Sequence, residues 1–271
     1  MYAKGSSLPV ITDTNPINPT GTLADGRPIF STAVNAGTRR DPRFNHINTV
    51  QSIGESTFKS MTLQASKRFA DGLTFNVQYS LGKGEDNTPL LTQLTVQAEP
   101  GRSDPTNLDR DKGPNPLDMR HNFTGDIVYT SQSNASNAVV RQLLSGNQFG
   151  VLLQINSGLP INILANQDLN LDGVSSDRPI GVARNSLYLP ARKNVDFRYS
   201  RKVRIQGNMA AEVIAEVKNI FNTEQVSSVN ATVTTNALGV PTAALPTSGS
   251  QLQPTGGYEQ RQFQLGFKFV F

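Results

Sequence analysis

The sequence predicts an all-β fold, namely an antiparallel transmembrane β-barrel. The chain is expected to supply part of that barrel, with about 7–8 long strands and long external loops. Three observations lead to this prediction. Hydrophobic and polar residues alternate over segments of about ten residues, the length that a tilted strand needs to cross a bilayer. Short and long connections alternate along the chain. The carboxyl terminus alternates in the same way and ends on an aromatic residue.

The alternating segments number seven, and each places its hydrophobic side chains on one face. They cover residues 61–69, 73–81, 119–129, 149–155, 195–203, 209–217 and 263–271. Strands of globular proteins are more often five or six residues long. The lengths therefore favour membrane-crossing strands over those of a soluble sandwich.

The connections sort by length as they do in outer-membrane barrels, which have short periplasmic turns and long external loops. Long pieces cover residues 85–117, 158–193 and 221–259, whereas Ala70-Asp71-Gly72 reads as a tight hairpin turn. We interpret residues 1–56 as an external loop with the remnant of a preceding strand. Residues 57–271 are then the C-terminal part of the barrel. Because residues 1–5 offer no apolar signal core, we expect the chain to be a fragment of a longer protein.

Composition narrows the class further. The chain has 271 residues, of which 37% are hydrophobic and 17% charged, with no Cys, no Trp and a net charge of +4. This is too apolar for disorder, and no stretch approaches a membrane helix. The small, scattered charge gives no reason to expect nucleic acid as a partner.

The final segment predicts a signal as well as a strand. Phe263, Leu265, Phe267, Phe269 and Phe271 share one face. We expect Phe267, Phe269 and Phe271 to form the C-terminal insertion signal, which the barrel assembly machinery reads. Other aromatic residues lie near predicted strand ends, where either an aromatic girdle at the lipid interface or packing in a core would place them: Phe69, Tyr79, Tyr129, Phe149, Tyr188 and Tyr199.

The charged residues in the strands are better explained by a water-filled barrel interior than by a catalytic site. Glu212 and Glu216 share the polar face of one strand, and we expect them to meet Arg198, Lys202 and Arg204 across the hairpin. Alternation places His121 on the lipid-facing side near the outer rim. With two His, no Cys and no nucleophile motif, the sequence gives no catalytic residue, and we expect no enzyme.

One loop segment has the opening pattern of a calcium loop. Asp168, Asn170 and Asp172 put oxygen atoms at alternate positions before Gly173, and Asp177 is a further oxygen ligand in reach. Pro179 stands where a bidentate Glu is expected. Two interpretations stay open: a Ca²⁺ ion that braces the loop, or an Asx-rich turn without metal.

Several stretches resemble the C-terminal barrel of TonB-dependent receptors of the Oar-like type, which carry a carboxypeptidase-regulatory-like domain. The likeness covers essentially the whole chain and lies in the order and spacing of its motifs. The stretches are residues 52–58 with 63–64, 67–69 with 72–75 and 79–80, 118–123, 157–160, 168–179, 194–198 and 216–222.

The resemblance implies a 22-stranded barrel with an amino-terminal plug, energised by TonB and used for substrate uptake. This chain contains no plug and only about a third of such a wall. The implied partners are outer-membrane lipid, the barrel assembly machinery, the missing N-terminal barrel and plug, and TonB through the parent protein. We expect the bacterial outer membrane as the location. The alternatives are a small outer-membrane barrel with an adhesive or structural role and a soluble, Ca-braced β-sandwich binding module.

Overall fold

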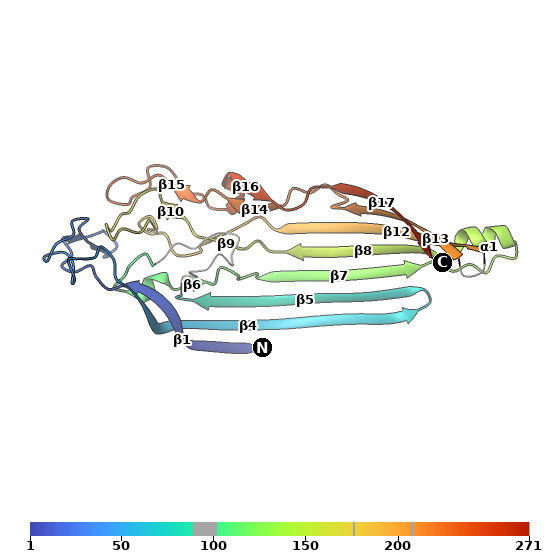
Figure 1. Cartoon of the computed structure of the whole chain (residues 1–271), viewed down its shortest axis with the longest axis horizontal. Helices are drawn as coiled ribbons and strands as arrows, with labels where there is room; N and C mark the ends of the chain where they lie inside the picture. The colour runs from blue at the N-terminus through green and yellow to red at the C-terminus, as the bar shows by residue number, and fades with distance from the viewer. Residues whose placement is uncertain (89–101, 176, 207–208, 271) are drawn as a thin grey trace.

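The computed structural model describes residues 1–88, 102–175, 177–206 and 209–270, and long strands dominate it (Figure 1). The eight long strands are β1 (Tyr2–Asp13), β4 (Asn48–Ala70), β5 (Leu73–Asp86), β7 (His121–Thr130), β8 (Asn147–Asn156), β12 (Arg192–Gln206), β13 (Met209–Lys218) and β17 (Gln262–Val270). They form one sheet in the order β1-β4-β5-β7-β8-β12-β13-β17, and the short β6 (Gly113–Pro114) pairs with the end of β5. All the neighbours along this path are antiparallel.

The predicted hairpin turn between β4 and β5 is confirmed. Asp71 and Gly72 both have positive φ, at 54° and 77°, as tight hairpins with a right-handed twist require. A side chain at Gly72 would also collide with the Thr130 carbonyl. The turn therefore needs glycine for both its backbone conformation and its packing.

The register divides the sheet into an oily and a wet face. On β17 the side chains of Phe263, Leu265, Phe267 and Phe269 are 62–79% exposed, and no second sheet covers them. Their partners on β13 are Val217, Ala215, Val213 and Ala211. The packing that a soluble β-sandwich needs on this face is therefore absent from the described residues.

The first two strands differ from the predicted boundaries. β1 runs to Asp13 and pairs with β4, which already begins at Asn48. The connection between them is thus residues 14–47, shorter than the predicted loop. The polar residues that begin β4 lack the alternation by which the other strands were found.

The long connections fold into a compact body at one end of the sheet, which we name the loop cap. It comprises the described parts of residues 14–47, 87–120, 157–191 and 219–261. Its short elements are β2 (Gly21–Thr22), β3 (Pro28–Ile29), η1 (Leu108–Asp111), β9 (Pro160–Ile161), β10 (Leu164–Ala165), β11 (Leu187–Tyr188), β14 (Val226–Val229), β15 (Thr232–Val233), η2 (Gly249–Gln251) and β16 (Pro254–Gly257). A small apolar core in the cap contains Ile161, Ile163, Leu189 and Val229.

The opposite end of the sheet carries α1 (Ala138–Leu144) in the link between β7 and β8 (Figure 1). Sequence alternation gave no sign of this helix. Among the described residues, no helix has the length and apolar character needed to cross a membrane.

Candidate functional site: the loop cap

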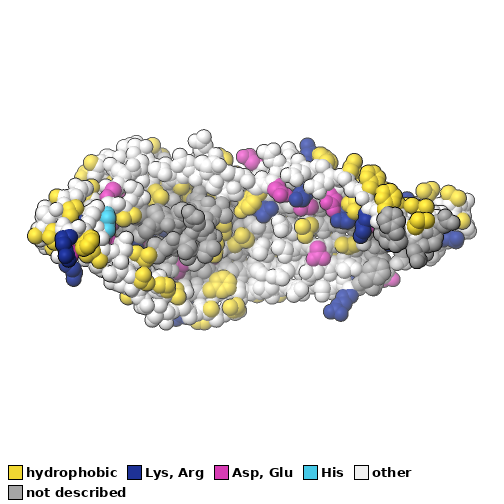
Figure 2. Space-filling model, in the orientation of Figure 1, with side chains coloured by type: hydrophobic (Ala, Val, Ile, Leu, Met, Phe, Trp, Pro, Cys, Tyr) yellow, Lys and Arg dark blue, Asp and Glu magenta, His cyan; other side chains and the backbone are white. Residues whose placement is uncertain are grey.

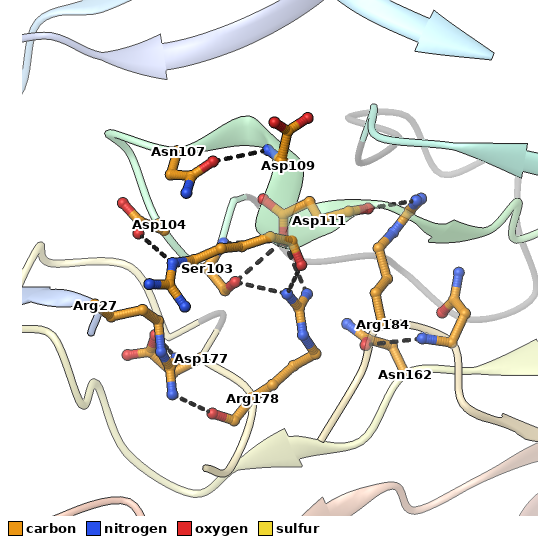
Figure 3. A network of polar contacts seen from close by, with 12 residues as sticks. Arg27, Ser103, Asp104, Asn107, Asp109, Asp111, Asn162, Asp177, Arg178 and Arg184 are labelled. Atoms are coloured by element: carbon orange, nitrogen blue, oxygen red, sulfur yellow. Dashed lines mark hydrogen bonds and ion pairs between the residues drawn. The ribbon is translucent and has the colours of Figure 1, made fainter. Parts of the chain in front are cut away.

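Three buried ion pairs stabilise the cap: two join separate loops, and the third joins a loop to the end of β5 (Figure 3). Arg27 pairs with Asp177 at 2.8 Å, Arg178 with Asp111 at 2.9 Å, and Arg184 with Asp86 at 2.5 Å. The side chains in all three pairs are at most 7% exposed. Charged groups are rarely buried so completely unless they are paired and hydrogen-bonded.

Arg27 fastens the first loop to the third. Its Nη1 donates to Asp177 Oδ1, and its Nη2 donates to the Arg178 carbonyl at 2.7 Å. Its Nε donates to Asp25 at 2.9 Å. The planar guanidinium can meet several acceptors at once, so one side chain connects segments about 150 residues apart.

The two other arginines connect the third loop to the second. Arg178 donates to Asp111 Oδ1, to Ser103 Oγ at 2.8 Å and to the Arg110 carbonyl at 2.7 Å. Arg184 donates from Nη1 to the carbonyls of Asp86 and Asp111, at 3.1 and 3.0 Å. These contacts hold the cap together through charge and hydrogen bonding more than through its small apolar core.

A pocket of about 290 Å³ opens beside this network. Its lining is Asp25, Arg27, Ser103, Arg110, Arg178, Pro179, Gly181, Val182 and Ala183. Arg110 pairs with Asp104 at 2.9 Å, so each of the three lining arginines already has a carboxylate partner. The pocket is therefore polar and close to charge balance, which suits a polar solute better than a strongly anionic one.

The predicted calcium residues lie together in this part of the cap, and most of their oxygens serve the local turn. Asp168 accepts from the Gly173 amide at 2.8 Å, and Asp172 accepts from the Val174 amide at 2.9 Å. Asn170 donates to Asp172 Oδ2 at 3.0 Å. Asp177 accepts from the amides of Leu169 and Asn170, in addition to its ion pair with Arg27.

Burial affects the ionisation of this loop. It raises the pKa of Asp172 to about 7 and the pKa of Asp177 to about 6, against the opposing effect of Arg27 on Asp177. Asp168 Oδ1 is buried and has no hydrogen-bond partner among the described residues. The same part of the chain contains no group of three or more His, Cys, Asp or Glu residues arranged to hold a metal ion. Calcium binding stays a prediction, and the observed contacts are those of an Asx-rich turn.

On the wet face, two of the three predicted basic residues lie opposite a glutamate, whereas Arg204 lies opposite Ala210. Arg198 and Glu216 form an ion pair at 2.6 Å, and Lys202 lies opposite Glu212 in the register. Gln64 donates to Asn76, which donates to Asp126, so polar contacts continue across three strands. A hollow of about 290 Å³ lies over this face, and its lining combines the charged Asp126, Arg198 and Glu216 with the apolar Val128 and Leu152. The hollow therefore presents both charged and apolar side chains.

His121 lies on the oily face, as predicted. His121 lies opposite Leu81, and its Nδ1 is 2.8 Å from the hydroxyl of Tyr79, on which it stacks.

Some of the aromatic residues lie where an aromatic girdle is expected. Phe149 lies opposite Tyr129 and Tyr199, and the Phe149 and Tyr199 rings are 5.4 Å apart. Tyr188 was assigned wrongly, because it belongs to the loop cap and donates its hydroxyl to Asp118 at 2.9 Å. Its place in a short loop strand was not visible from the sequence.

The predicted insertion signal lies on the oily face as far as the structure describes it. Phe267 and Phe269 are exposed there, and Phe271 lies outside the described residues. Their reading by the assembly machinery stays a prediction.

The cap arginines are the functional residues that sequence reasoning missed. Arg178 lies within a segment quoted for its family likeness, but no pattern linked it to Asp111, or Arg27 to Asp177. The partners are 67 and 150 residues apart, and loops have no periodicity from which to infer such contacts.

Comparison with known proteins adds one finding. Residues 3–183, more than half of the chain, match the family model described as an outer membrane beta barrel domain. A search of the curated proteins found no match.

Proposed function

Because the chain belongs to the outer membrane β-barrel domain family and thus to the bacterial outer membrane, we propose that it forms the C-terminal part of a TonB-dependent receptor barrel. In this proposal the whole receptor takes up a substrate that first meets the loop cap. The chain contributes the external loops and part of the barrel wall, by which we mean the sheet from β1 to β17. In this proposal it contributes no catalytic group. Its partners are lipid, the barrel assembly machinery, the remaining barrel and plug, and TonB.

The observation that carries this proposal is that the sheet is open where its outward face is apolar. On the outward face, the row of Tyr2, Lys59 and Lys83 is basic, and the next row contains Met61, Leu81 and His121. β1 pairs with β4 as far as Lys59, and two hydrogen bonds join Met1 to Ser60. In the described residues, seven strands from β4 to β17 form the apolar rows beyond Lys59.

Seven antiparallel strands would close only through a parallel pair, because the first and last run in the same direction, and bacterial single-chain barrels normally have an even number of strands. β4 and β17 both run away from the loop cap, and they are not paired with each other in the described residues (Figure 1). An unpaired backbone group in hydrocarbon costs several kcal/mol. The two unpaired edges support the proposal that further strands complete the belt, as a large receptor barrel would supply them.

Crosslinking between the sheet edges tests this proposal, since the chain contains no Cys. Tyr2→Cys is combined with Phe263→Cys, and the protein is treated in outer membranes with a short bifunctional maleimide. Val217→Cys with Phe263→Cys is the matched control, because these two residues are register partners. We expect a crosslink in the control pair and none between Tyr2→Cys and Phe263→Cys.

A crosslink between the edges would instead support a small complete barrel with an adhesive or structural role. That alternative is favoured by the count of eight long strands, since eight is a common size for small bacterial barrels. Retention on an immobilised periplasmic domain of TonB tests the receptor assignment separately. Protein extracted from outer membranes should be retained, and its failure to bind would remove TonB from the proposal.

A further inference from the structure

The helix α1 presents an apolar surface at the end of the sheet opposite the loop cap. It begins after Asn137, whose side chain accepts from the amides of Val139 and Val140, and it contains no buried residue. Val139, Val140, Leu143 and Leu144 are 41–65% exposed. Four exposed apolar side chains in seven residues are unfavourable in water.

The apolar residues of α1 occupy one side of the helix. Positions i, i+1, i+4 and i+5 share a face, which here contains the two valines and the two leucines. Ala138, Arg141 and Gln142 occupy the other face. The helix is thus amphipathic despite its length, as helices that lie on a membrane surface are.

Side chains from the strand ends tie this helix to the oily side of the wall. Arg201 donates to the Gln142 carbonyl at 2.7 Å, and Asn147 donates to the Leu143 carbonyl at 3.1 Å. Arg201 lies opposite Asn147 and Val213 in the register, and Val213 lies opposite Phe267. The end of α1 is therefore attached to the face that meets lipid.

The position along the wall is that of the membrane boundary. The row before Arg201 and Asn147 contains Tyr129, Phe149 and Tyr199, the aromatic row described above. Aromatic residues beside an arginine are typical of the zone where hydrocarbon meets lipid headgroups, and on β12 and β17 the oily face continues one row further, to Val203 and Phe269. Hydrophobic side chains gather at this end of the molecule, where β17 and α1 lie (Figure 2).

We propose that α1 is an interfacial anchor, lying in the periplasmic leaflet of the outer membrane with its valines and leucines among the lipid chains. Arg141 and Arg201 are placed to meet the phosphates of that leaflet. Phospholipid is the occupant that this surface fits, because the apolar face continues the lipid-facing wall and basic residues accompany it. The inference rests on the outer-membrane family and is independent of TonB.

Tryptophan fluorescence tests the anchor, since the chain contains no Trp. Leu143→Trp and Gln142→Trp place the probe on the apolar and polar faces of the same helix. The protein from outer membranes is reconstituted in phosphatidylethanolamine–phosphatidylglycerol vesicles, with and without brominated acyl chains. Phe263→Trp on β17 provides the lipid-exposed reference, and only preparations in which bromine quenches it are compared.

We expect blue-shifted emission and strong bromolipid quenching for Leu143→Trp, and water-like emission with little quenching for Gln142→Trp. Equal quenching at the two positions, whether high or low, would overturn the proposal. Low quenching at both would mean that the apolar face meets a periplasmic protein or a second copy instead. High quenching at both would mean that the helix is immersed and has no interfacial orientation.

Discussion

The wall leaves apolar side chains exposed on the protein surface, whereas the loop cap buries charged side chains. In the wall, Leu265 is 79% exposed, whereas in the cap Arg184 and Asp86 have side chains only 1% and 2% exposed. The wall also contains an ion pair, between Arg198 and Glu216, but its side chains are 49% and 30% exposed. One chain therefore contains apolar residues without protein neighbours and charged residues without solvent.

The difference shows that an exposed side chain is not necessarily in water. The outward face of the wall meets hydrocarbon, so its phenylalanines and leucines are stable without a protein core. The cap has no lipid to cover its apolar residues and only a small core of its own. It uses paired charges to fix loops that lie far apart in the sequence, and such pairs specify geometry more than they add stability.

The largest effect should come from breaking a pair in the cap. Arg184→Ala leaves Asp86 buried without its partner, and we expect a loss of about 3–5 kcal/mol in the stability of the cap. Hydrogen exchange should show rapid opening of the loops while the strand amides remain protected. Equal protection of the cap in the variant and in the natural protein would contradict this.

A charge on the oily face should have the next largest effect. Leu265→Arg on β17 should destabilise the wall by about 1–2 kcal/mol. A lipid-facing arginine costs about 2–4 kcal/mol at the bilayer midplane and about 0–1 kcal/mol near the interface, and Leu265 continues the row of Tyr199 and Ala215. Gln264→Arg on the adjacent wet position is the matched control and should change stability by about 0.5 kcal/mol or less. Guanidinium unfolding in lipid vesicles measures both, and equal losses would mean that the two faces are assigned wrongly.

The exposed ion pair of the wall should matter much less than the buried one. Arg198→Ala removes the partner of Glu216, but water reaches both groups, so we expect a change of about 0–1 kcal/mol. The same unfolding measurement applies. A loss as large as that of Arg184→Ala would remove the contrast between wall and cap.

The smallest effect should come from calcium. Since Asp177 already pairs with Arg27, we expect EDTA to change the rate of protease cleavage in the cap by less than about two-fold. A tightly bound ion at 100 times its Kd would add about 2.7 kcal/mol and protect the cap far more. Strong protection by calcium that is lost in Asp172→Asn would establish the metal interpretation of this loop.

The sequence predicted the wall because the wall repeats. Seven segments found by alternation correspond to strands from β4 to β17, and the position of His121 and the Arg198–Glu216 pair follow from the same period of two. β1 was expected only as a remnant, since Gly5, Ser7 and Pro9 interrupt its pattern. α1 was missed because seven residues are too few for a helical period to stand out.

The cap could not be predicted, because its contacts depend on the fold of the wall. Arg184 and Asp86 are 98 residues apart, and only the order of the strands brings their loops together. The calcium pattern was visible, but the pairing of Asp177 with Arg27 was not. Local spacing therefore left calcium and an Asx-rich turn both open, and it gave no sign of the ion pair.

The ion pairs between loops also determine when the outer end of the molecule acquires its structure. Arg27, Asp111 and Arg184 belong to three connections, and Asp86 ends β5, so these residues are far apart until the strands between them are in place. Contacts so distant in sequence form slowly, because the intervening chain must be ordered first. We therefore expect membrane insertion to precede assembly of the cap, and a protein halted during insertion to display its cap arginines and aspartates as separate, hydrated charges.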